Sequence, residues 1–360
     1  MTRQKSRKRV VMRAAAAALD LVLATGTVLS VYYCNYLAPV RFSVPASLSA
    51  SRDAQSPLPG LGSLMSDGLN LGDGVSLTTG DAVSQDGSEM APVTISGTPA
   101  DLSGKFADKF SSKTTATAST YQSKDLAISV TQHSFGAGQD QVTYYIADVY
   151  TSNLSCFKTY FAKNVYGSGF NEHITDMSAD VKAVLAVNGD SYCYNRSHTA
   201  GPLIRNGVIY RAEATTSDVC VLYNSGEMRT FSPDQFDLKQ VAAGGAYQSW
   251  TFGPRLLDDN GRAMTEFNTW DYIRKSHPRT AIGYYEPGHY CLVVVDGRQE
   301  GYSRGMTLPE LSQLFQDLGC KAAYNLDGGH STMMAMDGRL VNRPYKDTHE
   351  IVDCLYVGEV

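Results

Sequence analysis

The sequence predicts an α+β fold: one domain of mixed β-sheets with a few packed helices, preceded by a transmembrane helix and a disordered linker. Three observations support this. Short apolar runs outnumber helical patterns between residues 121 and 360, which is typical of a sheet-rich domain. Residues 43–119 are dominated by Ser, Gly, Thr, Asp and Ala and show no sustained apolar period. A basic N-terminus runs directly into a long apolar stretch.

The N-terminal residues predict a membrane anchor. Residues 1–13 contain six Lys or Arg and no acid, and residues 14–37 are mostly apolar and long enough to span a bilayer. We expect a cytoplasmic basic segment (1–13) and an uncleaved transmembrane signal anchor (14–37), with the remainder exported. Asp20 is costly inside a membrane, which leaves a signal peptide cleaved near Ala50 as the alternative.

The rest of the chain is acidic. The sequence has 31 basic and 36 acidic residues, and six of the basic ones lie in residues 1–13. An acidic body argues against nucleic acid as a partner. Residues 38–120 have too few apolar side chains to build a core, so we expect a flexible linker there and a folded domain over residues 121–360.

Apolar runs within residues 121–360 predict the elements of that domain. Strands are expected at 126–131, 142–150, 181–187, 203–210, 219–223, 251–257, 281–285, 290–295, 321–326, 332–336 and 351–357. Helices are expected at 157–164, 171–179, 233–241 and 308–318, the last with a T-x-x-E capping box and a glycine after its end. The cysteines lie mainly in apolar runs, so we expect buried thiols rather than a disulfide framework.

The segment YNLDGGHST, residues 324–332, is the strongest indication of a functional site. It places an amide, a carboxylate, two glycines, an imidazole and two hydroxyls at the end of a predicted buried strand. Glycines let a ligand approach the backbone closely, and strand ends commonly carry ligand-binding groups. Asp327 lies at the centre of this segment.

Four other segments carry similar chemistry. VNGDSY (187–192) ends a strand in Asn188 and Asp190, and VVVDGR (293–298) ends one in Asp296. Arg255 in FGPRLL and Arg279 in RTAIG are guanidinium groups among apolar neighbours, suited either to a phosphate or to a structural ion pair. Taken singly, a strand that ends in Asn-Gly-Asp is often only a turn.

Together these segments resemble the phosphodiester glycosidase family, which is related to the uncovering enzyme N-acetylglucosamine-1-phosphodiester alpha-N-acetylglucosaminidase and has a bacterial branch linked to exopolysaccharide biosynthesis. The resemblance also includes GPLIRNGVIYR (201–211), GMTLPEL (305–311) and VNRP (341–344), all in consistent order. The chain departs from the family where a third glycine of the final motif is replaced by His330, and where NGD continues with Ser191, Tyr192 and Cys193.

The resemblance implies hydrolysis of a glycosyl phosphodiester or phosphodiester-linked polysaccharide to a sugar and a phosphomonoester. Such a reaction needs charge stabilisation at the phosphate and a carboxylate base or nucleophile at the sugar carbon. We therefore expect Asp327, Asp190, His330 and Arg279 to be catalytic and to line a common cleft. Substrate-binding roles are expected for Asn188, Arg255, Asp296, Asn325, Gly328, Gly329, Ser331 and Thr332.

A metal is not required by this reading. The Asp and Asn side chains would suit Ca²⁺ or Mg²⁺, but their spacing does not demand an ion, so we expect no cofactor. His330 is equally consistent with a simple turn cap. Two alternatives stay open for the whole chain: an envelope protein that binds glycan without cleaving it, and a metal-dependent phosphodiesterase that cuts at phosphorus.

Overall fold

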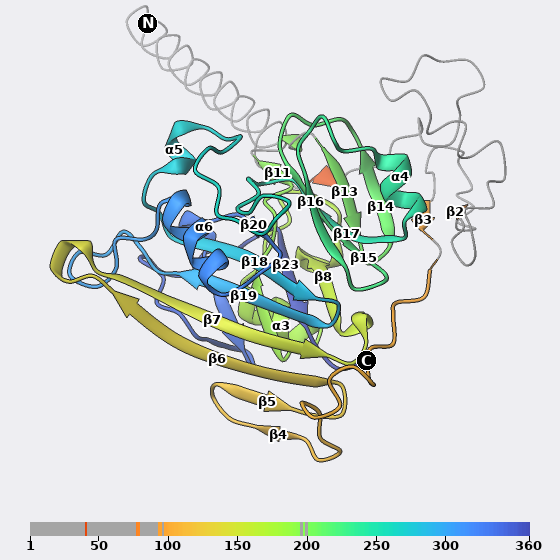
Figure 1. The fold of residues 1–360 in the computed structure, drawn as a ribbon, viewed down its shortest axis with the longest axis horizontal. Helices are drawn as coiled ribbons and strands as arrows, with labels where there is room; N and C mark the ends of the chain where they lie inside the picture. Colours follow the sequence, from red (N-terminus) through yellow and green to blue (C-terminus); the bar gives the residue numbers. More distant parts are fainter. Residues whose placement is uncertain (1–39, 42–76, 80–92, 96, 195–196, 199–200) are drawn as a thin grey trace, which may run out of the picture.

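The computed structural model describes residues 40–41, 77–79, 93–95, 97–194, 197–198 and 201–360 (Figure 1). The predicted basic segment, the predicted anchor and much of the predicted linker lie outside these residues. Within them, no helix has the length and apolar content needed to cross a membrane. The described part contains several sheets and few helices, so the α+β class is confirmed. Every pairing between its named strands is antiparallel.

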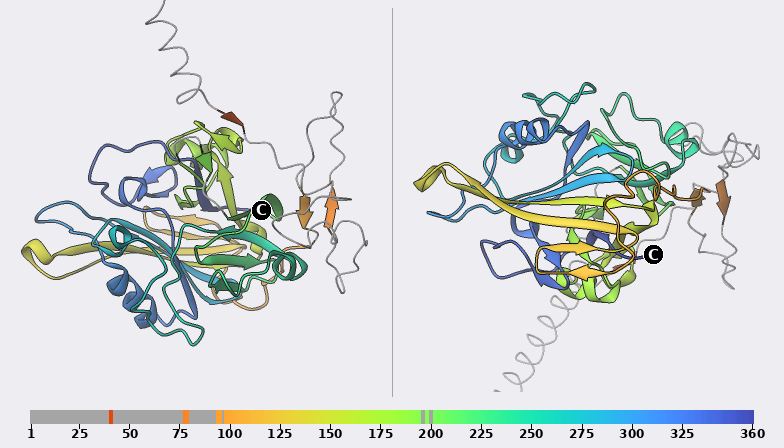
Figure 2. Two further views of the ribbon diagram at one scale, coloured as in Figure 1. Left: turned by 90° about the horizontal axis from the view of Figure 1, so that it is seen from above. Right: turned by 60° about the horizontal axis from the view of Figure 1, so that its bottom comes forward.

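A seven-stranded sheet forms the centre of the molecule. Its strands run in the order β20 (Ala322–Asn325), β18 (Arg279–Glu286), β19 (His289–Val295), β7 (Val142–Thr151), β6 (Leu126–Phe135), β5 (Thr120–Gln122) and β4 (Thr115–Ala116). The turn that joins β6 and β7 projects beyond the rest of the domain, as the views from other sides also show (Figure 2).

Both faces of this sheet are covered at β19 and β20, which explains their continuous apolar runs, whereas β4 and the second half of β6 are exposed. Along β19, Tyr290, Leu292 and Val294 point into one core, and Cys291 and Val293 point into a second core on the opposite face. The first core lies against the other sheets. The second lies against α6 (Leu308–Asp317), through side chains that include Leu311 and Phe315.

A five-stranded sheet packs on the first face of the seven-stranded sheet. Its order is β22 (Arg339–Leu340), β21 (Met334–Met336), β10 (Leu185–Asn188), β23 (Asp353–Val357) and β8 (Phe157–Phe161). Its outer side is covered by α3 (Ile174–Asp180), whose Ile174 and Met177 pack against Ala186, Ala335 and Cys354.

Smaller sheets complete the domain. One contains β16 (Met228–Phe231), β15 (Val219–Tyr223) and β17 (Ala246–Trp250), and another contains β13 (Pro202–Arg205), β14 (Val208–Ala212), β3 (Val93–Ile95) and β2 (Leu77–Thr79). Two-stranded pairs join β1 (Val40–Arg41) to β9 (Gly167–Ser168), and β11 (Cys193–Tyr194) to β12 (Ser197–His198). Two short helices, α4 (Leu238–Ala243) and α5 (Asp271–Arg274), lie outside the sheets.

Several local predictions hold. The α6 helix starts with the expected capping box, in which the Thr307 hydroxyl accepts from the Glu310 amide and the Glu310 carboxylate accepts from the Thr307 amide. Gly319 follows its end in the left-handed conformation, with φ +79°. The cysteines of the described part are buried free thiols, as expected.

Other predictions were wrong for identifiable reasons. The expected strand 203–210 is a hairpin, because Asn206 and Gly207 both take positive φ and turn the chain between β13 and β14. The expected helix 157–164 is strand β8, whose alternate residues are buried. Residues 251–257 form no named strand, since Gly253 takes φ +69° in the middle of the run.

Folded segments also precede residue 121, where the sequence places the start of the domain. Val93 and Ile95 are each 3% exposed in β3, which pairs with β14. Phe106 stacks edge-on against Tyr150 of the central sheet, with ring centroids 5.1 Å apart. This part of the chain has too few apolar side chains to form a core by itself. Instead, Val93 and Ile95 are buried in a cluster with side chains of β14 and β15.

We predict that Ile95→Ala lowers the free energy of unfolding by about 2 kcal/mol or more, because it removes a buried side chain and leaves a cavity. Chemical denaturation of the full chain measures this change. Thr94→Ala, at the partly exposed neighbour, is the matched control. An Ile95→Ala variant as stable as the parent would show that β3 contributes nothing to the fold.

Candidate active site

The loop after β20 lies where the two large sheets meet. Leu326 donates its amide to the Thr280 carbonyl of β18, and the chain then leaves the sheet at Asp327. Gly328 is required at the next position, because a Cβ there would lie 2.8 Å from the Pro278 carbonyl oxygen. Gly329 takes φ +66°. The two glycines therefore let the loop turn tightly against the start of β18.

Asn188, the last residue of β10, fixes this loop from the other sheet. Its side-chain amide donates to the Asp327 carbonyl at 2.7 Å, and its oxygen accepts from the Thr280 hydroxyl at 2.5 Å and from the Met333 amide at 3.2 Å. The next carbonyl, of Gly189, accepts from the Asp327 amide at 3.2 Å. Asn188 is 1% exposed, so we assign it a positioning role.

Asp327 presents a carboxylate at the edge of this buried framework. Its Oδ1 accepts from the Gly328 amide at 2.8 Å, and the Ser331 hydroxyl is a second donor. Burial raises its pKa to about 6, against these hydrogen bonds, and the nearby Asp190 carboxylate raises it further. A carboxylate with a pKa near neutrality and a partly exposed position is suited to act as a base or a nucleophile.

Two stacked histidines border the same loop. The Ser331 hydroxyl lies 3.2 Å from Nε2 of His349, whose ring stacks on that of His330 with centroids 4.0 Å apart. Nε2 of His330 lies 2.7 Å from the Asp347 carbonyl, which can only accept, so this nitrogen carries the proton. Burial lowers the pKa of His349 to about 4, and the neighbouring His330 and His173 lower it further. His349 is therefore neutral near pH 7. The sequence did not predict that His349 belongs to this site.

Arg298 supplies an exposed guanidinium on the other side of the loop. It donates to the hydroxyls of Tyr345 at 2.9 Å and Tyr272 at 3.1 Å, and it lies 3.2 Å from Nδ1 of His277. A Cβ on Gly329 would be 3.3 Å from this guanidinium, so Arg298 lies beside this glycine. Among the residues that the structure describes, no carboxylate pairs with Arg298. The sequence singled out the VVVDGR motif that contains Arg298, but it predicted a role in the site only for Asp296 of that motif.

Arg279 does not extend into the site. Its guanidinium is buried and donates to three carbonyls, those of Met306 at 3.0 Å and of Ile273 and Lys275 at 2.5 Å each. Burial lowers its pKa to about 10, with a smaller contribution from Arg298. The expectation that Arg279 clamps a phosphate is therefore corrected: this residue positions the α5 segment, because these carbonyls occupy its donors.

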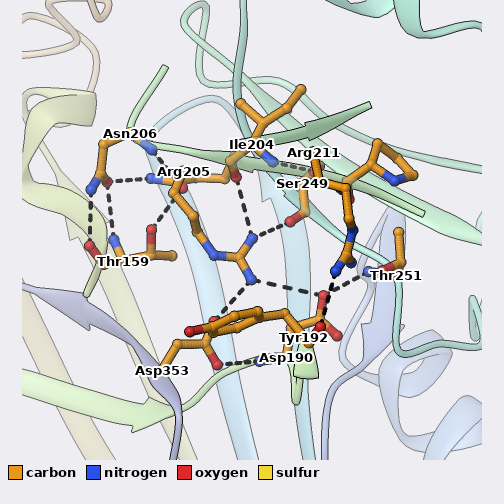
Figure 3. Close-up of polar contacts among 12 residues, drawn as sticks. Thr159, Asp190, Tyr192, Ile204, Arg205, Asn206, Arg211, Ser249, Thr251 and Asp353 are labelled. Atoms are coloured by element: carbon orange, nitrogen blue, oxygen red, sulfur yellow. Dashed lines mark hydrogen bonds and ion pairs between the residues drawn. The ribbon is translucent and has the colours of Figure 1, made fainter. Parts of the chain in front are cut away.

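Asp190 lies beneath the loop in a buried ion-pair network (Figure 3). It is 2% exposed and accepts from the Thr251 amide at 2.8 Å, while Arg205 lies 3.8 Å from it and 2.9 Å from Asp353. Arg211 adds a second buried cation, whose charge lowers the pKa of Asp190 against the larger effect of burial. Asp190 and Arg279 are each 2% exposed, whereas Asp327 and His330 are partly exposed, so the four residues do not line one accessible surface.

Arg255 and Asp296 are also used elsewhere. Arg255 pairs with Asp259 at 3.2 Å. Asp296 is 1% exposed, and its oxygens accept from Asn342, Tyr302 and the Arg343 amide at 2.8 to 3.0 Å. The buried Asp296 is occupied within the protein, which corrects the expectation for that residue, whereas a substrate contact of Arg255 stays a prediction.

Asn325 and Thr332 flank the loop as buried residues. The Asn325 amide donates to the Gly253 carbonyl at 2.8 Å, and its oxygen has no partner among the described residues. The Thr332 hydroxyl is likewise buried without a partner in this part of the chain. The described residues contain no group of three or more His, Cys, Asp or Glu side chains able to hold a metal.

We predict that Asp327→Asn makes the protein more stable at pH 8, by about 2 kcal/mol. The pKa of Asp327 rises from 3.8 to about 6 on folding, so the folded state binds this proton more tightly and loses stability as the pH rises through that window. The amide has no charge to bury. Thermal unfolding from pH 4 to pH 8 tests this: the advantage of the variant should fade toward pH 4. Asp259→Asn, at a 71% exposed carboxylate, is the control.

Comparison with known proteins supports the family resemblance. Residues 181–358 match the family model described as phosphodiester glycosidase. The SPbeta prophage-derived uncharacterized protein YomE of Bacillus subtilis is 30% identical over 181 residues, which are 49% of this chain; the chain covers 28% of the length of that relative.

Two solved structures share the fold. The zebrafish N-acetylglucosamine-1-phosphodiester alpha-N-acetylglucosaminidase catalytic domain, auto-inhibited by its pro-peptide, aligns with a TM-score of 0.53 and 20% identity over 69% of this chain and 88% of its own. A hypothetical protein from Synechocystis aligns with a TM-score of 0.51 and 13% identity over 79% of this chain and 67% of its own. At these identities the likeness concerns the fold, whereas the phosphodiester glycosidase family model matches residues 181–358, which include all of the DGGH loop (residues 327–330).

Proposed function

We propose that this chain is a hydrolase that cleaves a glycosyl phosphodiester into a free sugar and a phosphomonoester at the Asp327 loop. The match to the family model supports the reaction class. The observation that carries the proposal is that one loop brings together the partly exposed Asp327 and the exposed Arg298, whose guanidinium lies beside Gly329, two positions after Asp327. The positive group suits the phosphate of the substrate, and the negative group suits the sugar carbon at which the bond breaks.

Arg298 is suited to bind the phosphate. A guanidinium matches phosphate oxygens in pairs, and this one has no carboxylate to compete for it among the described residues. The hydroxyls of Tyr272 and Tyr345 surround it and can turn toward the same oxygens. His277 donates Nε2–H to the Tyr272 carbonyl, so its Nδ1 accepts from Arg298 and orients the guanidinium.

Asp327 is suited to the sugar side of the reaction. As a base it removes a proton from water that attacks the anomeric carbon; as a nucleophile it forms a glycosyl ester that water then hydrolyses. In both cases the C–O bond to the phosphate breaks, and the phosphate leaves as a monoester anion. A phosphate is a good leaving group, so Arg298 can stabilise its charge without a strong acid.

The histidine pair shapes the entrance to the loop. His349 is neutral and holds the Ser331 hydroxyl, which in turn donates to Asp327. His330 covers His349 and places its ring beside Tyr345, with centroids 5.4 Å apart. We propose that Ser331 and His349 position the Asp327 carboxylate and that His330 orients the phosphate.

The N-terminal sequence suggests where the reaction takes place. Residues 14–37 have the length and composition of a signal anchor, with basic residues before it. We propose that the domain is held outside the cytoplasm and acts on cell-envelope or exopolysaccharide glycans. Fractionation of cells that express the full chain, with protease added from outside, tests this placement.

Hydrolysis in water labelled with oxygen-18 tests the reaction itself. The substrate is a 4-nitrophenyl phosphodiester of N-acetylglucosamine 1-phosphate, with the glucose analogue run in parallel. Attack at carbon places the label in the sugar, as we propose. Label in the phosphate would instead support a phosphodiesterase that cuts at phosphorus, and binding without release of product would support a glycan-binding protein.

We predict that Asp327→Asn lowers turnover by about 100-fold or more, equivalent to about 3 kcal/mol of transition-state stabilisation. The amide keeps the shape of the loop, so circular dichroism should show a folded protein. Asp259→Asn serves again as the control for loss of an acidic group. A folded Asp327→Asn variant with the turnover of the parent would remove Asp327 from the reaction.

Arg298→Gln should lower kcat/KM about 100-fold, because it removes a charge-assisted contact with the phosphate. The matched control is Arg229→Gln, at an exposed arginine of β16 that pairs with Glu227. Steady-state kinetics on the same substrate compare the two variants. Equal effects of both substitutions would contradict a specific role for Arg298.

A further inference from the structure

An aromatic shelf borders the candidate active site. It consists of Trp270 and Tyr272, at the start of α5, whose side chains are 81% and 58% exposed. The chain has two tryptophans, and the other, Trp250, is fully buried. Exposing most of a tryptophan side chain to water is unfavourable unless a ligand or another protein covers it.

The segment that carries the shelf is firmly anchored, so its exposure is not the result of a loose loop. Arg279 donates to the carbonyls of Ile273 and Lys275, and Arg274 donates to the Phe267 carbonyl at 2.7 Å. Phe267 is 4% exposed and belongs to the core beneath. Much of the bonding capacity of a buried arginine thus holds the shelf in place.

The shelf is continuous with the phosphate-binding end of the site. The Tyr272 hydroxyl accepts from Arg298, and the Tyr272 ring lies 4.5 Å from that of His277. Following the contacts outward from Asp327, the order is Asp327, Gly329, Arg298, Tyr272 and then Trp270 of the same helical segment. Tyr272 therefore adjoins the guanidinium that is proposed to bind the phosphate, and Trp270 lies two positions before it in the chain.

We propose that Trp270 and Tyr272 form a sugar-stacking subsite that binds the glycan on the leaving-group side of the phosphodiester. This inference rests on the proposed function. A sugar ring has an apolar face of C–H groups and a polar rim. The shelf offers two aromatic faces next to the polar groups of Asn268, Asp271 and Lys275, all exposed.

The shelf fits a sugar better than a protein partner. A stable protein interface buries about 800 Å² on each side around an apolar centre. Here the exposed aromatic residues are two, set among charged and amide side chains, which is not a broad apolar patch. Continuity with a site proposed to act on a glycosyl phosphodiester favours a glycan as the occupant.

Tryptophan fluorescence provides the test, since Trp270 is the exposed member of the pair. The full chain carrying Asp327→Asn is titrated with linear hexasaccharides of glucose, galactose, mannose and N-acetylglucosamine. We expect at least one to shift the emission in a saturable manner. Calorimetry should show that adding Trp270→Ala weakens binding of that oligosaccharide about tenfold. Phe135→Ala, at a 42% exposed aromatic on the β6–β7 turn, should leave it unchanged.

Three outcomes would overturn the proposal: no hexasaccharide perturbs the emission, Trp270→Ala binds as tightly as its parent, or Trp270 emits as a buried residue before any sugar is added. The last, if dependent on protein concentration, would show that a second copy of the chain covers the shelf. Failure of the shelf and failure of the proposed function are distinguishable. Binding that depends on Trp270 in a chain without phosphodiester hydrolysis would disprove the hydrolase and keep the subsite.

Discussion

The contacts of Asn188 are the constraint on which the candidate site depends. This one amide bonds to the Asp327 carbonyl, to the Thr280 hydroxyl and to the Met333 amide, so it ties the end of β10 to both ends of the active loop and to β18. The partners belong to different sheets, which have no strand pairing with each other at this point. Because Asn188 is buried, each of these bonds is protected from competition with water. The position of the carboxylate is thus set by the packing of one sheet on another.

Asn188 is in turn held by the charged network below it. Gly189 has no side chain because a Cβ would lie 2.6 Å from an Asp353 oxygen, and the Asp190 amide donates to that same carboxylate at 2.9 Å. Arg205 neutralises Asp353 and approaches Asp190 (Figure 3). Buried carboxylates without such a cation would be protonated or would unfold the site. The arginine therefore has an indirect effect on the reaction: it offsets negative charge that would otherwise push the pKa of Asp327 still higher.

Local chemistry was predictable from the sequence where it needs only neighbouring residues. The capping box of α6 and the glycine after its end each involve residues only a few positions apart. Two adjacent glycines likewise predict the tight turn of the DGGH loop. Pairings between distant residues gave no such signal. The contact of Arg205 with Asp353 spans 148 positions, and His349 is a single histidine in a polar segment. Sequence also could not distinguish Arg298 from Arg279, because the difference lies in which one finds carbonyl partners in the fold.

The replacement of glycine by His330 shows how this chain can depart from the family pattern without disturbing the loop. Gly329 needs its positive φ, but His330 does not take a left-handed conformation, so a side chain is tolerated there. Its ring then stacks on His349 and lies near Tyr345, both from the segment after β22. That segment closes over the loop through side-chain contacts that a glycine could not provide. The substitution thus adds an imidazole that contacts two rings of a distant segment, while Arg298 remains exposed.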